Sequence, residues 1–224
     1  MRTTLVVCES PWTTEKGFLA RWSMRPFVEG IAELYDVRLV YRTFTSGHEL
    51  RRLLSYEAID RPEGRVLVYV ACHGFGGRLS VGRKGSEIVN LAPLAQTLYG
   101  GVEGVWLGAC DVGQSRALQD FLKNSGAIWA GGYVCSVDWA ASLLLDLAVL
   151  QELLRSGPVR TRSRLLRVLK VALKSFDPNW KIGADRHERG VPLRHAIRVL
   201  ARDKSRGARP KDVSEDLRYA LGWQ

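Results

Sequence analysis

Long hydrophobic runs are missing from this 224-residue sequence, and their absence argues against a membrane-spanning or secreted protein. The most apolar stretch, residues 140–154, contains Asp146 and Glu152 and is shorter than the roughly 20 apolar residues that a transmembrane helix needs. Near the amino end, the apolar run at residues 5–8 is far too short for the core of a signal peptide. We therefore expect a cytoplasmic protein that does not enter a membrane.

Cysteine and histidine are scarce, with four residues of each, and their spacing does not suggest a metal site. Zinc sites usually draw on closely spaced ligands, and disulfides rarely persist in a reducing compartment. No C-x-x-C pair occurs, and only His73 stands next to a cysteine. The glycine-rich motifs G-x-G-x-x-G and G-x-x-x-x-G-K-[ST] are also absent, which argues against a bound nucleotide. The sequence therefore predicts neither a metal nor an organic cofactor.

Acidic residues do not balance the basic ones, because the net charge is +10 and the whole excess lies in residues 155–224. A helix predicted over residues 160–176 carries cations along one side. These cations are Arg160, Arg164, Arg167, Lys170 and Lys174. Three interpretations stay open: a solvated helix face, a surface for an acidic protein such as an activator or substrate, and a surface for nucleic acid. Few aromatic residues accompany the cations, which argues against stacking on a single strand.

Apolar, strand-like segments alternate with helical segments along the first two thirds of the chain. The predicted strands are residues 4–8, 37–41, 65–71, 102–109 and 127–130, and the predicted helices are residues 26–34, 46–58, 91–98, 115–123 and 138–154. This alternation is typical of right-handed βαβ crossovers, which form a mostly parallel sheet with helices on both faces. Residues 78–89 are predicted as a β-hairpin, residues 195–201 as a last strand and residues 214–221 as a closing helix. We expect one α/β domain over residues 1–224, with the basic residues 155–224 completing the fold.

Two of the predicted strands end in residues that can carry chemistry. In open parallel sheets, reacting groups gather beyond the carboxyl ends of the strands. Strand 65–71 runs into His73 and Gly74, and strand 102–109 runs into Cys110. A cysteine nucleophile needs a proton carrier and hydrogen-bond donors for the oxyanion that it creates. His73 fits the first need, and the backbone N–H groups of Gly74 and Cys110 fit the second.

An inert core is the competing interpretation of these cysteines, because cysteine is among the residue types most often buried. Cys72 and Cys135 also stand near strand ends. The residues alone therefore leave open which thiol reacts, or whether any does.

The order of the motifs resembles the caspase-like (clan CD) cysteine peptidases. The stretch A-C-H-G-F-G-G at residues 71–77 is similar to their histidine loop, and W-L-G-A-C at residues 106–110 is similar to their nucleophile strand. The segments that follow, at residues 117–122, 125–127, 131–133 and 137–139, are similar in order to the CHAT branch, which is related to separase. The resemblance covers residues 65–154 well and the flanks by topology only.

This resemblance implies a three-layer α/β/α sandwich and a cysteine endopeptidase without a cofactor. Cys110 would be the nucleophile, His73 would protonate the leaving amine, and the N–H groups of Gly74 and Cys110 would bind the oxyanion. Standalone relatives are often bacterial and associated with defence or regulated cell death, so the resemblance favours one dedicated protein substrate.

Carboxylates at the expected specificity pocket suggest cleavage after a basic residue. In the resembling family this pocket lies near the end of the first strand and the loop after the nucleophile region. Here these positions hold Glu9 and Asp138, and Asp111 stands beside the cysteine. A carboxylate at the base of the pocket would pair with Arg or Lys of the substrate. Structural roles compete with this hypothesis, because Asp138 stands where a helix N-cap belongs and Glu9 could simply be solvated.

A binding module is the alternative function. In that case the chain would have a caspase-like fold without peptidase activity, and its basic face would bind an acidic protein or nucleic acid. Replacing Cys110 separates the two hypotheses, since only an enzyme would lose its function.

Overall fold

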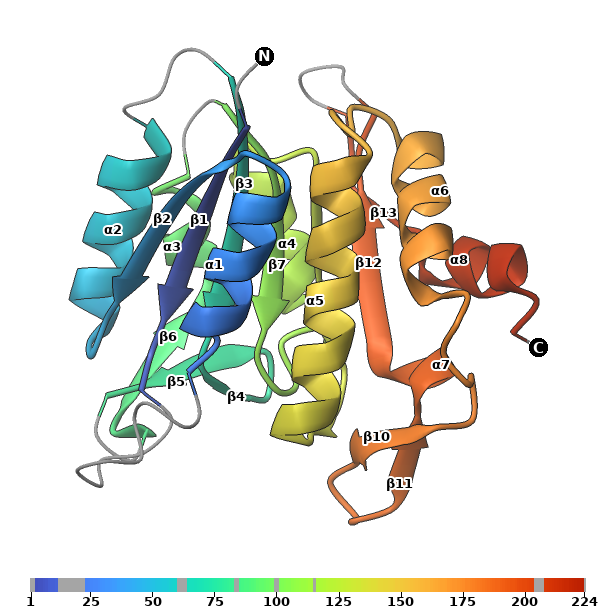
Figure 1. Cartoon of the computed structure of the whole chain (residues 1–224). Coiled ribbons are helices and arrows are strands. Elements are labelled where there is room, and N and C mark those ends of the chain that lie inside the picture. Colours follow the sequence, from blue (N-terminus) through green and yellow to red (C-terminus); the bar gives the residue numbers. More distant parts are fainter. Residues whose placement is uncertain are drawn as a thin grey trace.

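A seven-stranded sheet forms the middle layer of the molecule (Figure 1). The structure, a computed structural model, describes residues 3–11, 23–59, 64–82, 85–98, 101–114, 116–203 and 208–223. In the order β13-β12-β8-β7-β3-β1-β2, the strands are Lys211–Asp212, Ile197–Ala201, Trp129–Tyr133, Val102–Gly108, Arg65–Ala71, Thr3–Glu9 and Arg38–Thr43. Neighbours from β8 to β2 are parallel, whereas β12 is antiparallel to both β8 and β13. The prediction of a mostly parallel sheet is confirmed.

Helices cover both faces of this sheet (Figure 1). One face carries α1 (Arg25–Leu34), α5 (Trp139–Arg155), α6 (Arg162–Leu173) and α8 (Ser214–Leu221), and the other carries α2 (Gly47–Ile59), α3 (Leu91–Ala95) and α4 (Ala117–Asn124). Successive side chains of a strand point to opposite faces, so each central strand contributes to two apolar cores. Leu67, for example, packs in the core below α5, and Val68 packs in the core with α4. The three-layer α/β/α architecture is therefore confirmed.

The central strands β3 and β7 are buried along their whole length. Their near-continuous apolar sequences fit parallel strands that are covered on both sides. Their charged residues pair with each other at the amino ends, where Arg65 Nε donates to Glu103 Oε1 at 2.8 Å. Arg65 also donates to the Leu153 carbonyl of α5 at 2.7 Å, which fastens the carboxyl end of that helix to the sheet. Burial raises the pKa of Glu103, and the bonds from Arg65 oppose that rise.

A single buried carboxylate ties α5 to three neighbouring strands. Asp146 of α5 is 1 % exposed. Its oxygens accept hydrogen bonds from Tyr69 Oη of β3 at 2.6 Å, from Trp106 Nε1 of β7 at 2.5 Å and from Tyr133 Oη of β8 at 2.6 Å. Tyr69 and Trp106 each stand four residues before a candidate catalytic residue. Asp146 therefore fixes the relative position of the strands that carry the candidate site.

Several short elements were not predicted from the sequence. Strands β9 (Ser136–Val137), β10 (Lys181–Ala184) and β11 (Gly190–Pro192) form a small sheet of their own, and α7 (Leu193–Ala196) and β13 are also new. The hairpin predicted at residues 78–89 is confirmed as β5 (Arg78–Val81) paired antiparallel with β6 (Glu87–Asn90), and β4 (His73–Phe75) adds a third strand that was not predicted. The predicted helix start at Ser115 lies outside the described residues. Among the helices that the structure describes, none has the length and apolar character needed to cross a membrane.

Candidate active site

His73 and Cys110 lie together at the carboxyl edge of the sheet. Ala71 of β3 pairs with Gly108 of β7, and the two candidate residues follow two positions later on each chain segment. His73 is exposed and Cys110 is partly exposed. The sheet register thus brings the chain segments that carry His73 and Cys110 to the same edge of the sheet.

Gly74 presses its backbone against that of Cys110. A Cβ atom placed on Gly74 would lie 2.0 Å from the Cys110 carbonyl oxygen and 2.9 Å from the Cys110 nitrogen. Real Cβ atoms do not come so close to backbone atoms, so only glycine fits here without a shift of the chain. The two N–H groups predicted to bind the oxyanion therefore belong to backbone segments in direct contact.

The sulfur of Cys110 faces hydrogen-bond donors from β9. Val137 donates its backbone N–H to Cys110 Sγ at 3.3 Å, and Ser136 Oγ lies 3.8 Å from the same sulfur. The thiol in turn donates to the Val137 carbonyl oxygen, which lies 3.9 Å from the sulfur. The sequence analysis missed both residues, because a two-residue strand gives no readable pattern.

The other cysteines are enclosed by the core. Cys8 and Cys72 are 0 % exposed and Cys135 is 1 % exposed. Burial raises the pKa of Cys72 well above its usual value and raises that of Cys135 to about 12, with a smaller contribution from the neighbouring Cys110 in both cases. Thiols with such pKa values stay protonated at neutral pH and are poor nucleophiles. Burial and raised pKa values therefore argue against Cys72 and Cys135 as nucleophiles, whereas Cys110 is partly exposed.

The turn after Cys110 is held by an unusual backbone conformation at Asp111. This residue has φ 60°, a left-handed value that Asp and Asn tolerate better than most residues. Its carbonyl accepts the N–H groups of Gly77 at 3.0 Å and Gln114 at 3.1 Å, and its own N–H donates to the Cys135 carbonyl at 3.1 Å. The carboxylate accepts Gln114 Nε2 at 2.7 Å, and burial raises its pKa against that bond. Asp111 thus links three segments: the loop after His73, the turn after Cys110 and the residues that follow β8.

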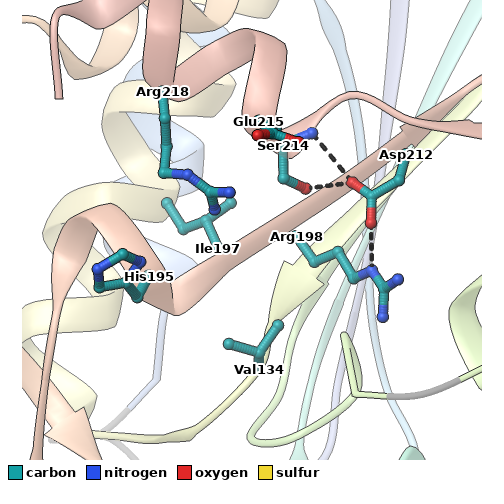
Figure 2. Close-up of a pocket in the computed structure, with 8 residues that line it drawn as sticks. All are labelled: Val134, His195, Ile197, Arg198, Asp212, Ser214, Glu215 and Arg218. Atoms are coloured by element: carbon teal, nitrogen blue, oxygen red, sulfur yellow. Dashed lines mark hydrogen bonds and ion pairs between the residues drawn. The ribbon is translucent and has the colours of Figure 1, made fainter. Parts of the chain in front are cut away.

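Strand β12 contacts the same turn through Arg198, which also belongs to a polar network around Asp212 (Figure 2). Arg198 donates to the Gly113 carbonyl at 3.2 Å and pairs with Asp212 at 2.7 Å. Asp212 in turn accepts Ser214 Oγ at 2.6 Å. These residues line a cavity of 340 Å³ that also includes His195, whose pKa is lowered by burial and by Arg194 and Arg218. The basic C-terminal third therefore braces the loop that carries Cys110.

Asp138, a predicted pocket residue, lies at the start of α5. It is exposed, and its Oδ1 accepts the Ala141 N–H at 3.0 Å. The predicted N-cap is confirmed. The preceding residue, Val137, is the one that donates its N–H to Cys110 Sγ. A capping carboxylate that stays exposed can still meet a basic side chain of a substrate.

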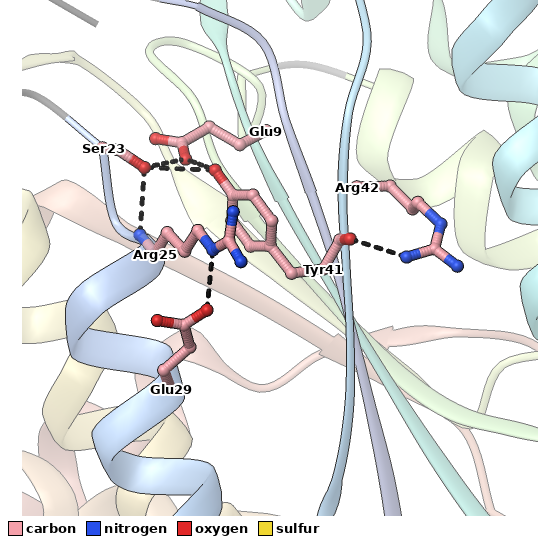
Figure 3. A network of polar contacts seen from close by, with 6 residues as sticks. All are labelled: Glu9, Ser23, Arg25, Glu29, Tyr41 and Arg42. Atoms are coloured by element: carbon pink, nitrogen blue, oxygen red, sulfur yellow. Dashed lines mark hydrogen bonds and ion pairs between the residues drawn. The ribbon is translucent and has the colours of Figure 1, made fainter. Parts of the chain in front are cut away.

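Glu9, the other predicted pocket carboxylate, is buried and already engaged (Figure 3). Its oxygens accept Ser23 Oγ at 2.8 Å and the Met24 N–H at 3.0 Å, and they also accept the hydroxyl of Tyr41. Burial and the bond to Glu9 raise the pKa of Tyr41 well above its usual value. Arg25, at the start of α1, lies over the Tyr41 ring at 5.4 Å. The network joins β1, β2 and α1, so a substrate would have to displace these donors to reach Glu9.

The predicted basic stripe lies on α6 and the residues beside it. Arg160, Arg167, Lys170 and Lys174 are exposed, whereas Arg164 is partly buried and donates to the Ser156 carbonyl. The apolar side of α6, through Leu165 and Leu169, packs in the core with α5. This arrangement fits a solvated helix face.

No family model and no curated protein sequence matches this chain. Solved structures do match. A secreted C11 cysteine protease from Bacteroides thetaiotaomicron, crystallised with an irreversible peptide inhibitor, is 11 % identical with a TM-score of 0.54 over 98 % of this chain and 68 % of that chain. Caspase-1 from Spodoptera frugiperda is also 11 % identical with a TM-score of 0.54, over 89 % of this chain and 86 % of that chain. The fold is caspase-like. A sequence identity of 11 % supports a shared fold and nothing finer, so the assignment to the CHAT branch stays a prediction.

Proposed function

We propose that this caspase-like chain is a cysteine endopeptidase with Cys110 as nucleophile and His73 as proton carrier. The observation that carries the proposal is the position of Cys110: its partly exposed sulfur meets the Val137 N–H at 3.3 Å at the carboxyl edge of the sheet, where the histidine loop also ends. The cysteine proteases among the structural neighbours support the same class of activity.

The proposed reaction follows from these positions. Cys110 Sγ, as thiolate, attacks the carbonyl carbon of the peptide bond, and the new C–S bond leaves a negative charge on the carbonyl oxygen. The N–H groups of Gly74 and Cys110 stabilise this oxyanion. When the C–N bond breaks, His73 gives its proton to the leaving amine. Water then hydrolyses the thioester while His73 takes up a proton, which restores the thiolate and releases the acid.

The finer parts of this proposal rest on the sequence resemblance. The separase-related CHAT branch, a single dedicated protein substrate, an activating partner and a role in bacterial defence or cell death follow from it alone. The cytoplasmic location and the single domain over residues 1–224 rest instead on the apolar pattern of the sequence. A catalytically silent binding module is the outcome expected if no peptide is cleaved under any condition.

Alkylation combined with a peptide-library digest tests the proposed activity. We expect the folded protein to cut library peptides, and brief treatment with iodoacetamide to stop the cutting while labelling Cys110 and sparing the three cysteines that are 0–1 % exposed. Mass spectrometry reads both the cut sites and the labelled residue. Cutting that continues after complete labelling of Cys110 would refute its role, and labelling of Cys135 first would show that the burial argument is wrong.

Replacing Asp138 by Asn tests the basic preference. Asn caps helices as well as Asp does, so the Ala141 bond and α5 should remain while the charge is lost. We expect kcat/KM for peptides cut after Arg or Lys to fall about 10–100-fold, with little change for uncharged residues. Asp120→Asn, an exposed carboxylate on α4, is the matched control. An unchanged Arg preference in Asp138→Asn would exclude Asp138 from the pocket.

A further inference from the structure

A second cavity, of 660 Å³, lies between the outer face of α4 and the segment that leads into β13. It is separate from the candidate active site, because none of its lining residues belongs to the turn at 110–114 or to β9. Its α4 side consists of residues at helical spacing, including Arg116, Asp120 and Lys123. The opposite side includes Arg202, just beyond β12, and Arg209.

Positive charge dominates this cavity and is not neutralised. Four cations and one carboxylate line it among the described residues. Arg116, Lys123 and Arg209 are exposed and take part in none of the ion pairs or side-chain hydrogen bonds of the described part of the chain. Asp120 lies on the same face of α4 as Arg116 and Lys123 and forms an ion pair with neither of them. Four cations against one carboxylate around a cavity create a local positive potential that attracts anions.

Arg202 is anchored beside this cavity and carries a buried donor that the described residues do not satisfy. One terminal nitrogen donates to the Leu122 carbonyl and, at 2.7 Å, to the Ser125 carbonyl at the end of α4. Its Nε is buried and has no hydrogen-bond partner. Buried N–H donors are almost always paired in folded proteins, by protein atoms, water or a ligand. The guanidinium is thus fixed in place with one donor still to be satisfied.

We propose that this cavity, here called the α4 anion pocket, binds a small compound with several phosphoryl groups. Arginine donors match phosphate oxygens in geometry as well as charge. The volume lies in the range of small-molecule sites, roughly 300–1,000 Å³. No aromatic side chain lines the pocket among the described residues, so stacking on a nucleobase contributes nothing to recognition there. The basic stripe of α6 lies on the opposite face of the sheet and cannot extend the pocket into a track for a long polyanion (Figure 1).

Inorganic tripolyphosphate is the probe for this pocket. We expect 1:1 binding by isothermal titration calorimetry at about 0.15 M salt and a raised melting temperature, whereas sulfate at the same concentration binds at least about tenfold more weakly. The double variant Arg116→Gln/Lys123→Gln removes two exposed charges without touching the Arg202 bonds to α4. It should weaken tripolyphosphate binding at least about tenfold.

The control removes the same charge elsewhere. Arg167→Gln/Lys170→Gln, on the exposed face of α6, should leave the affinity within about twofold. The site is refuted if wild type does not bind tripolyphosphate at millimolar concentration, or if the α6 pair weakens binding as much as the α4 pair. Tighter binding of an oligonucleotide than of tripolyphosphate, lost in the α4 pair, would also overturn it in favour of nucleic acid. Cys110→Ala should bind the probe as wild type does, so this test is independent of the peptidase proposal.

Discussion

Replacement of Cys110 by alanine is expected to remove all measurable peptide cleavage, a loss of at least about 10⁴-fold in kcat/KM. The covalent route begins at this sulfur, and no other described thiol is more than 1 % exposed. His73→Ala should lose about 10²–10⁴-fold, because the leaving amine would then take its proton from water. Both effects are measured as kcat/KM on the best peptide of the library digest, with thermal melting to show that the variants remain folded.

The matched control for this experiment is Cys135→Ala. Cys135 neighbours the candidate site and its carbonyl accepts the Asp111 N–H, but that contact belongs to the backbone and survives the substitution. Activity should therefore stay within about threefold of wild type, apart from any loss of stability from the small cavity. Cleavage that survives in Cys110→Ala and disappears in Cys135→Ala would show that Cys135, and not Cys110, is the nucleophile. Cleavage that survives in both would place the chemistry elsewhere.

Replacement of Asp146 by alanine is expected to lower the free energy of unfolding by at least about 3 kcal/mol. The side chain accepts three buried hydrogen bonds, and its removal leaves the donors of Tyr69 and Trp106 without a partner in the core, whereas the Tyr133 hydroxyl keeps the Ser142 carbonyl at 3.2 Å. An orphaned buried donor costs about 1–3 kcal/mol, and the vacated volume adds to the loss. Denaturant unfolding measures the effect, and Glu33→Ala, an exposed carboxylate on α1, should change stability by no more than about 0.5 kcal/mol.

The pH dependence of stability provides a second measurement on Asp146. Burial raises its pKa to about 6, against opposition from the bonds of Tyr133, Tyr69 and Trp106. Between the ordinary pKa of 3.8 and about 6, the folded protein holds the proton while the unfolded chain has released it. The stability contributed by this group is therefore fully present below pH 4 and falls as the pH rises to 6.

A comparison of wild type with Asp146→Asn isolates this contribution, because the other titrating groups are shared. The stability advantage of wild type should be greater at pH 4 than at pH 7 by about 3 kcal/mol, the free energy that corresponds to the pKa difference. An advantage that instead grows with pH would mean that the three hydrogen bonds outweigh burial and hold the carboxylate ionised.

Part of the candidate site was predictable from the order of the motifs and from the apolar pattern of the strands. The pattern of residues 65–71 predicted β3 with its observed bounds, because a strand buried on both faces reads as one apolar run. The apolar run at residues 102–109 likewise predicted β7 to within one residue, and the resemblance to caspase-like peptidases then selected Cys110 just after it. What the pattern did not contain is the register: the pairing of Ala71 with Gly108 is a property of the assembled sheet. That pairing places His73 level with Cys110.

Contacts around the sulfur were beyond the reach of the sequence. Val137 belongs to β9, whose partner Gly183 lies in β10, far along the chain. A two-residue strand has no periodicity, and its conformation depends on a distant segment. The sequence also does not distinguish the strand-end cysteines Cys72, Cys110 and Cys135, because the burial of each thiol depends on which distant residues pack over it. The carboxylates Glu9 and Asp138 looked alike as well, yet the first is enclosed by three donors and the second is exposed at a helix end.

The sequence by itself determined the α/β alternation, the two strand ends that carry His73 and Cys110, the N-cap at Asp138 and the concentration of positive charge in residues 155–224. These are local properties, set by the spacing of apolar residues and by the backbone preferences of a few positions. Only the tertiary structure decided which thiol is accessible, which carboxylates are free, and that Arg202 lies with an unsatisfied donor beside cations of α4. The reason is that solvent exposure, hydrogen-bond satisfaction and local potential depend on residues that are distant in sequence and meet only when the layers pack.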